Sequence, residues 1–243
     1  MSLSPAPAAA ALLDAVDRAR AGGWIDRGLA LASLAGVEVD RLCAQPLGQL
    51  QRSALELHQV VAGHELEAKA DCPACGGAVE FPVSVEELLA LPDDVPTAGH
   101  VAMGEFAAAW RVPSVDDLRN AAVAADPVRA LRARCVSPTH DGAAIDVDSL
   151  PEGVESEVER AMADGDRLAE VLVDVACPEC GVSFVADLDP IGFVWAGVES
   201  QARRTLRQVD VLARAYGWTE REILALSPAR RSAYLAIVRG ERP

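Results

Sequence analysis

Lysine and aromatic residues are scarce in this 243-residue chain, and these shortages limit the kind of core and the classes of partner that it can have. Aromatic residues make up 4% of the sequence, whereas hydrophobic residues of all kinds reach 51%, so the core must be aliphatic and general disorder is excluded. Lys69 is the one lysine, and 22 basic residues face 37 acidic ones, which gives a net charge of −15. A field of this sign repels phosphate backbones and anionic membranes, so it argues against broad nucleic-acid or lipid binding.

The chain also lacks a long uncharged apolar run. The longest, residues 28–37, covers about half of the ~20 residues that a membrane span requires. The amino-terminal residues carry no basic stretch of the kind that opens an export signal. These absences predict a cytoplasmic protein without a membrane segment, and in that compartment cysteines stay reduced. The six cysteines are therefore candidates for metal ligands or buried thiols rather than disulfides.

Hydrophobic periodicity separates helical from extended stretches. Apolar residues three and four positions apart predict helices in residues 1–63, and strict alternation predicts strands on both sides of two cysteine pairs. Residues 84–168 have a mixed pattern, in which alternation over 106–112 predicts a strand and Asp126, followed by proline, predicts a helix start. Residues 137–148 are expected to form an exposed loop.

Capping residues mark the expected helix boundaries. Asp189, followed by proline, predicts the start of the longest helix, and Gly217 predicts its end. A Ser or Thr three residues before an acidic residue forms a capping box and predicts further helix starts. This pattern occurs at Ser84, Ser114, Ser149 and Thr219, and Ser227 before proline is a similar start. The order of helical and extended stretches predicts an α+β fold.

Two short segments repeat one motif, Cys72-Pro-Ala-Cys75-Gly and Cys177-Pro-Glu-Cys180-Gly. Two residues between cysteines bring both sulfurs to one ion at ~2.3 Å, and the glycine permits the left-handed backbone that aims N–H groups at sulfur. Each such zinc knuckle supplies two ligands, and a structural zinc needs four. The sequence therefore predicts one closed four-cysteine Zn²⁺ site whose halves lie 105 positions apart. The alternative is that one or both pairs are packed thiols without metal.

These motifs divide the chain into three parts. Residues 1–63 form an N-terminal helical region, residues 64–189 a zinc-ribbon domain with a mixed helical insertion at about 84–168, and residues 190–243 a long helix and a C-terminal helical tail. From residue 190 onward nine arginines oppose five acidic residues, so this part carries +4 and the rest −19. The arginines fit either a solvated helix face or a docking surface for an acidic partner.

No catalytic constellation stands out in the sequence. Cys43 and Cys135 lie in apolar contexts that favour buried thiols over nucleophiles, and none of the four histidines lies beside a nucleophile. There is no phosphate-binding glycine loop, nucleophile elbow or His-Glu-x-x-His motif. Because a closed four-sulfur site leaves zinc no open position, we expect a protein that is not an enzyme.

The C-terminal segment concentrates aromatic residues that are rare elsewhere. Both tyrosines and one tryptophan fall between residues 216 and 234, beside an arginine pair. Aromatic residues together with arginine are typical of interface hot spots. The candidate partner-binding residues are therefore Tyr216, Trp218, Arg230, Arg231 and Tyr234. The alternative is that the aromatic residues anchor a helical hairpin to the core.

Several of these motifs together resemble one family. The second knuckle, the stretch 189–195, the long arginine-bearing helix and the segment Tyr-Gly-Trp-x-Glu-x-Glu-Ile-Leu-x-Leu-Ser at 216–227 are similar to the baseplate hub assembly proteins (chaperones) of T-even-type phages. They are equally similar to relatives encoded with bacterial contractile injection systems. The first knuckle and residues 129–135 fit the same resemblance, which runs over most of the chain, although the first 60 residues are generic.

The resemblance implies a non-enzymatic assembly factor, or a minor component, of the baseplate hub of a phage tail-like contractile injection system. The implied partners are hub or tape-measure proteins, and the four knuckle cysteines are the positions that map to the family. Two other hypotheses stay open. One is a zinc-ribbon nucleic-acid- or transcription-associated module, which the net charge opposes and the positive C-terminal part supports. The other is an enzyme that uses zinc only as a scaffold.

Overall fold

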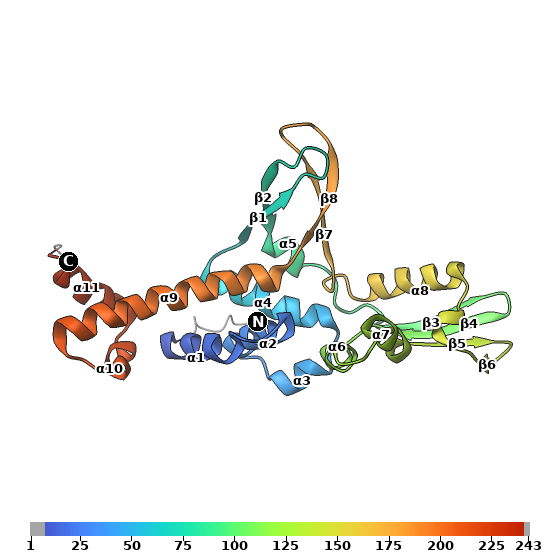
Figure 1. The fold of residues 1–243 in the computed structure, drawn as a ribbon, viewed down its shortest axis with the longest axis horizontal. Coiled ribbons are helices and arrows are strands. Elements are labelled where there is room, and N and C mark those ends of the chain that lie inside the picture. The colour runs from blue at the N-terminus through green and yellow to red at the C-terminus, as the bar shows by residue number, and fades with distance from the viewer. Residues whose placement is uncertain (1–7, 241–243) are drawn as a thin grey trace.

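The computed structural model describes residues 8–240, and its centre is a bundle of helices. Helices α1 (Ala9–Ala19), α2 (Trp24–Leu34), α3 (Val39–Cys43) and α4 (Leu47–Val61) come first in the chain. Figure 1 shows α1, α2 and α4 lying along α9 (Pro190–Tyr216), the longest helix. The core that these helices share is almost entirely aliphatic, as the composition predicts.

Two close contacts hold this bundle together. A Cβ at Gly28 of α2 would lie 2.8 Å from Leu50 of α4 and 3.0 Å from Ile191 of α9, so glycine lets the three backbones approach. The indole Nε1 of Trp24 donates to Asp189 Oδ1 at 2.8 Å. Asp189 is also the N-cap of α9, as its position before proline predicts, so the start of α9 is tied to the start of α2.

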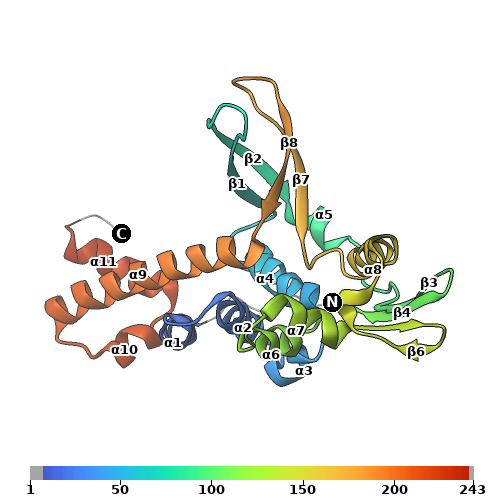
Figure 2. The ribbon, with the colours of Figure 1, turned by 45° about the vertical axis from the view of Figure 1, so that its right-hand side comes forward.

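Two β-hairpins rise side by side from the helical layer (Figures 1 and 2). The first consists of β1 (Glu65–Asp71) and β2 (Ala78–Ser84), and the second of β7 (Val171–Ala176) and β8 (Ser183–Leu188). Alternate residues of both hairpins are buried and form shared apolar clusters. The alternation in the sequence therefore predicts these four strands correctly.

The second hairpin repeats the first one 105 residues later. The antiparallel pair Leu66–Val83 recurs as Val171–Leu188, and every pair between them keeps the same offset. A helix begins directly after each hairpin, capped in both cases by the side chain of the residue before it. The two halves of the predicted zinc ribbon are thus equivalent in backbone structure as well as in motif.

Between the hairpins the chain forms a second antiparallel sheet. Its strands are β3 (Ala98–Met103), β4 (Phe106–Arg111), β5 (Val136–His140) and β6 (Ala143–Ala144), which pair in that order. Helix α8 (Glu152–Gly165) packs on β3 and β4 (Figure 2). The remaining elements are α5 (Val85–Leu89), α6 (Val115–Ala122), α7 (Pro127–Cys135) and the 3₁₀ turn η1 (Val147–Ser149). Helices and small antiparallel sheets together make the fold α+β, and β4 confirms the strand expected at 106–112.

Two predictions for this region are wrong. Residues 137–148, expected as an exposed loop, contain most of β5 and all of β6. Strand β5 pairs with β4 and β6 pairs with β5, and hydrophobic periodicity within the segment does not reveal such partners. Pro138 lies inside β5 opposite Ala108, and proline within a run argues against a strand in the sequence. Ser149, expected to cap a helix, instead ends η1, and α8 begins after Pro151 without a side-chain cap.

A buried carboxylate fastens α6 to its neighbours. Asp117 is 2% exposed and forms the predicted capping box with Ser114. It also accepts two hydrogen bonds from Arg111 of β4, at 2.5 and 2.9 Å, and one from Nε of Arg134 of α7 at 2.9 Å. The Arg111 guanidinium holds the pKa of this carboxyl well below its usual range.

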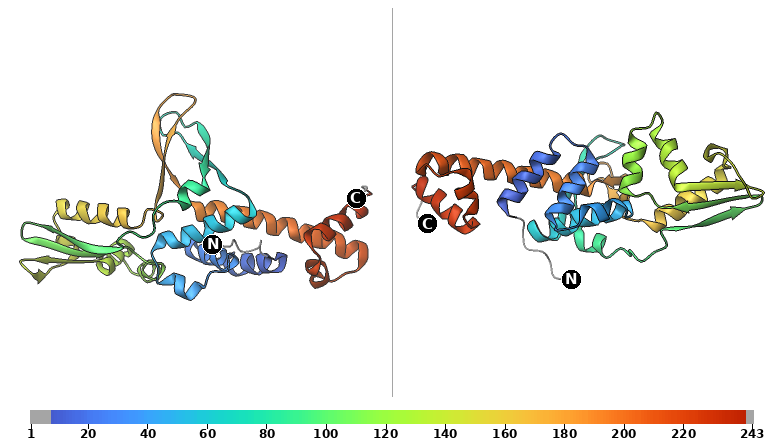
Figure 3. Two further views of the ribbon diagram at one scale, coloured as in Figure 1. Left: turned by 180° about the vertical axis from the view of Figure 1, so that it is seen from behind. Right: turned by 90° about the horizontal axis from the view of Figure 1, so that it is seen from below.

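The C-terminal residues fold back on α9. Gly217 ends α9 in the left-handed region at φ 68°, as predicted. Thr219 caps α10 (Glu220–Ala225) and Ser227 caps α11 (Pro228–Val238), again as predicted. Figure 3 shows both short helices beside the second half of α9, with which they share a buried cluster. Within residues 8–240, no helix combines the length and apolarity needed to cross a membrane.

Candidate metal centre

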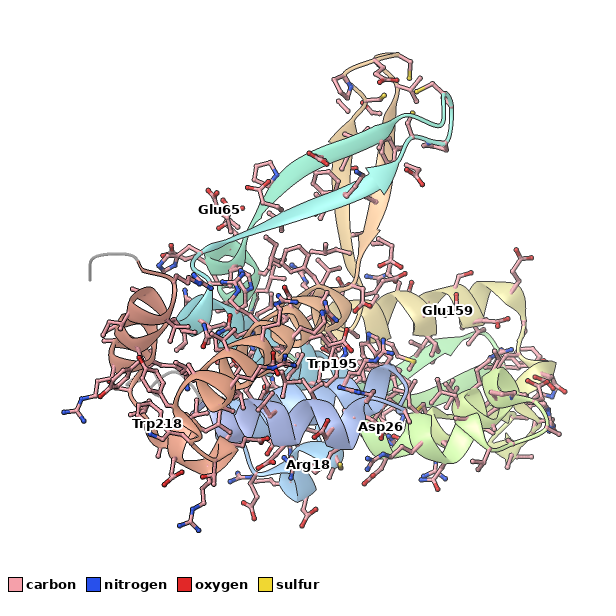
Figure 4. The ribbon with its side chains drawn as sticks, turned by 60° about the vertical axis from the view of Figure 1, so that its left-hand side comes forward. Arg18, Asp26, Glu65, Glu159, Trp195 and Trp218 are labelled. Carbon is pink, nitrogen blue, oxygen red and sulfur yellow. The ribbon has the colours of Figure 1, made fainter. Side chains whose placement is uncertain are left out.

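The four knuckle cysteines come together at the free end of the paired hairpins. Cys72 and Cys75 lie in the turn between β1 and β2, and Cys177 and Cys180 in the turn between β7 and β8. Figure 4 shows sulfur atoms gathered at this end of the strands. In each turn the first cysteine is 2% exposed and the second is exposed. The sequence therefore predicted correctly that residues 105 positions apart form one cluster.

The spacing of the four sulfurs fits a single tetrahedral ion. Cys72 Sγ lies 3.6 Å from Cys180 Sγ, and Cys75 Sγ lies 3.7 Å from Cys177 Sγ. All four sulfurs lie within 4.8 Å of one another. Four thiolates at ~2.3 Å from one tetrahedral ion have sulfurs about 3.8 Å apart, and a disulfide bond would need about 2.05 Å. The cluster is therefore the size of a mononuclear metal site, and its thiols are not bonded to each other.

Both turns hold their cysteines with the same backbone hydrogen bonds. The Cys72 N–H donates to Gly77 O at 2.9 Å, and the Gly76 N–H donates to Cys72 O at 2.8 Å. The second turn repeats this pair of bonds at 2.9 Å each, 105 residues later. Gly76 and Gly181 have φ of 71° and 74°, the left-handed conformation that glycine adopts without strain. The glycine after the second cysteine thus has the role that the motif predicts.

Backbone N–H groups near the sulfurs stabilise negative charge on them. The N–H of Cys75 lowers the pKa of the Cys72 thiol to about 7, helped by the N–H of Ala74 and by neighbouring thiols. For Cys75 itself the N–H of Gly77 lowers the pKa, but the Cys72 thiol and burial outweigh it and raise that pKa to about 12. Without metal the cluster therefore favours a thiolate at Cys72, and an ion that binds all four sulfurs must displace the remaining protons.

An acidic side chain lies beside the cluster. Glu179 Oε2 is 3.9 Å from Cys75 Sγ, and a Cβ at Gly77 would lie 2.4 Å from the same oxygen. Glycine at 77 therefore makes room for this carboxylate. Glu179 belongs to the second knuckle, and its carboxylate lies against the first knuckle. Four thiolates and one divalent cation leave a net charge of −2, so the whole centre has an acidic surface.

Within residues 8–240, the other cysteines and acidic groups form no comparable site. Cys43 and Cys135 are 6% and 4% exposed, and burial raises the pKa of both thiols, as expected for packed thiols. Glu105, His140 and Asp141 also have ligand atoms within 4.8 Å of one another. Glu105 and Asp141 lie in turns of the second sheet, His140 ends β5 and stacks on a phenylalanine ring, and two of the three are exposed.

The predicted partner-binding residues divide into three groups in the structure. The rings of Tyr216, Trp218 and Tyr234 contact one another, with centroids 4.6 to 5.6 Å apart, and they close the turn between α9, α10 and α11. Arg230 is exposed. Arg231 is 6% exposed, so it does not belong to the outer surface of the tail; it faces inward because it lies one position further around α11.

No family model, curated protein or solved structure matches the chain. No relative therefore supplies a function or a ligand for the cysteine cluster. What the site can do follows from its own geometry, which is a four-sulfur position for one ion at the end of two hairpins. Within residues 8–240, sequence reasoning missed the buried network at Asp117 and the inward position of Arg231, since both depend on contacts between distant elements.

Proposed function

We propose that the four knuckle cysteines bind one structural Zn²⁺ and so complete a split zinc ribbon. The supporting observation is the size of the cluster, 3.6 and 3.7 Å between sulfurs of opposite knuckles. Four sulfur donors in a tetrahedron select zinc or iron, and zinc is the ion of closed four-cysteine sites that carry no redox chemistry. When bound, the ion would cross-link the two knuckles, and the four sulfurs would leave it no open coordination position.

The metal would reinforce the contact between the ends of the two hairpins. Each hairpin has two strands, and an isolated two-stranded hairpin is marginally stable in water. The cluster of buried residues between the hairpin ends is small and includes Cys72 and Cys177 themselves. Structural zinc contributes roughly 10 kcal/mol of apparent binding free energy. On this proposal the metal cross-links the free ends of the two hairpins, whose other ends connect to the 84–168 insertion.

At the level of function, we propose a zinc-stabilised, non-enzymatic assembly protein or minor component of the baseplate hub of a phage tail-like contractile injection system. The support is the resemblance of the second knuckle and of residues 216–227 to that family, together with a metal centre whose donor set is complete without substrate. The proposal places the protein in the cytoplasm, with hub or tape-measure proteins as partners.

The outer surface of the tail is the proposed docking surface. Tyr216 is 38% exposed and Arg230 is exposed on the adjacent helix, which gives the aromatic and arginine composition of an interface hot spot. Two arginines near the end of α9, Arg207 and Arg214, are exposed at the same end of the molecule, and the side chain of Arg214 is 80% exposed. An acidic surface on the partner would complement this end.

Affinity purification from the organism that encodes the chain tests the proposal. The tagged full-length protein is compared with a Tyr216→Ala, Arg230→Glu double variant and with an Arg203→Glu control, whose charge change lies on α9 away from the tail. We expect mass spectrometry to find sheath, hub or tape-measure proteins with the wild type and the control, and much less with the double variant. Eluates that contain none of these proteins would contradict the assignment.

A nucleic-acid- or transcription-associated zinc ribbon is the second candidate. The observation that favours it is the +4 charge from residue 190 onward, against −19 for the rest. Phosphate contacts release counterions, so binding of this kind weakens steeply as salt rises. A gel shift that forms at low salt, is lost at high salt and requires the α9 arginines would favour this candidate, as would polymerase subunits in the eluate described above.

A further inference from the structure

A cavity of about 640 Å³ lies where α1, α4, α9 and α11 meet. Its α9 residues, from Phe193 to Thr205, lie mainly in the first half of that helix, beside which Figure 3 shows α1, whereas α10 and most of α11 lie beside the second half. Most of its lining is aliphatic, and the polar side chains on its wall are His58, Gln201, Thr205 and Arg231. The volume is in the range of small-molecule binding sites, roughly 300–1,000 Å³.

Arg231 is the unusual member of this wall. Its side chain is 6% exposed, and Nη1 is buried without a hydrogen-bond acceptor among the described residues. No aspartate or glutamate lines the cavity. Two of its polar neighbours are already paired, since His58 Nε2 contacts Glu65 O at 3.0 Å and Thr205 Oγ1 donates to a backbone carbonyl at 3.0 Å. A buried guanidinium in such surroundings needs an anion.

Gly197 gives a second, independent indication of a ligand. It lies in the interior of α9 and lines the cavity, and glycine within a helix is destabilising relative to alanine. Close packing does not require it, because a Cβ at this position would meet no atom within 4 Å. Gly197 is exposed and lines the cavity, so a side chain there would lie at the solvent-facing edge of the cavity. Glycine at 197 therefore costs helix stability and keeps the cavity accessible.

We propose that this cavity binds a small amphiphilic carboxylate, whose apolar part lies along the aliphatic wall and whose carboxylate accepts hydrogen bonds from Arg231. The described walls are helices, so they present no strand edge to which an extended peptide could add. The volume and the single unpaired guanidinium fit a compact molecule with one anionic group.

Isothermal titration calorimetry on the full-length, metal-loaded chain tests this site, with sodium decanoate as the probe and decanol as its uncharged counterpart. We expect decanoate to bind with one-to-one stoichiometry and decanol to bind much more weakly. Arg231→Gln keeps most of the side-chain volume and removes the charge, so it should weaken decanoate binding about tenfold to a hundredfold. The matched control Arg230→Gln, on the exposed face of the same helix, should leave the affinity unchanged.

Gly197→Leu tests the location without touching the charge. It should abolish decanoate binding while preserving the circular dichroism spectrum, because leucine favours the helix and fills the entrance. Equal affinity for decanol and decanoate, or an Arg231→Gln affinity equal to that of the wild type, would overturn the role of the guanidinium. Binding that Gly197→Leu leaves intact would place the ligand elsewhere. Failure of decanoate, with binding of an acidic peptide instead, would assign the cavity to a protein partner and overturn the proposal.

Discussion

Replacing Asp117 by asparagine removes a charge from the most densely hydrogen-bonded carboxylate in the insertion. The two oxygens accept five hydrogen bonds, from Arg111, Arg134 and Ser114. The Asp117 side chain is 3% exposed, whereas those of Arg111 and Arg134 are 44% and 43% exposed. Because both arginines can regain water when the carboxylate is lost, the full value of charged hydrogen bonds must be discounted. We expect Asp117→Asn to lower the free energy of unfolding by about 2–3 kcal/mol.

The pH dependence of this loss provides a stricter test. Hydrogen bonding from Arg111 lowers the pKa of Asp117 in the folded protein, and the unfolded chain has an ordinary aspartate pKa of about 3.9. A lowered folded-state pKa stabilises the protein above the unfolded pKa, and this contribution disappears as pH falls toward the folded pKa. The difference between wild type and variant should therefore be constant above about pH 5 and shrink below about pH 4.

Urea unfolding followed by circular dichroism measures both effects. Asp116→Asn is the matched control, because Asp116 precedes Asp117 on the same helix and its side chain is 53% exposed. This variant should change the free energy of unfolding by less than about 0.5 kcal/mol. The reasoning is refuted if Asp117→Asn costs no more than this control. It is equally refuted if the difference between wild type and Asp117→Asn stays the same from neutral pH to pH values below about 3.

Three further predictions concern the bundle and the hairpins. Gly48→Ala should destabilise the chain by about 1 kcal/mol or more in thermal unfolding, because the alanine Cβ would lie 2.0 Å from the Asp166 carboxylate that caps α4. Helix propensity alone would make this variant more stable than the wild type, and that result would contradict the prediction. Cys177→Ser should release the metal and speed amide hydrogen exchange in both hairpins, whereas the control Cys135→Ser should do neither. If the amides of the first hairpin stay protected from exchange in Cys177→Ser, the hairpins do not depend on the metal. Trp24→Phe should lower the free energy of unfolding in urea by about 1 kcal/mol, because it removes the hydrogen bond from the indole to Asp189, the N-cap of α9. A variant as stable as the wild type would show that this hydrogen bond does not contribute.

Features encoded in a few neighbouring residues were predictable from the sequence. The starts of α9, α10 and α11 follow from Asp189, Thr219 and Ser227, whose side chains cap the helices directly. The cysteine cluster was predictable for a different reason. A knuckle supplies two of four ligands, so two matching knuckles imply one site even when a long insertion separates them.

Features that depend on distant partners could not be predicted in this way. Strand β5 forms because β4 pairs with it, and its central Pro138 obscures the strand pattern. Arg231 stands beside Arg230 in the sequence, yet the packing of α11 on α9 buries one and exposes the other. The cavity has no sequence signal, because it arises where four separate helices meet, and Gly197 alone is an ordinary interior glycine until the space around it is known.

The metal content of the purified full-length chain tests the central claim most directly. Elemental analysis combined with native mass spectrometry should find one zinc per chain in the wild type, none after Cys72→Ser, and one again in a Cys43→Ser control whose thiol lies outside the cluster. A wild-type protein that folds with four unreacted knuckle thiols and no bound metal would contradict the account. One iron per chain in place of zinc would contradict the identity of the ion.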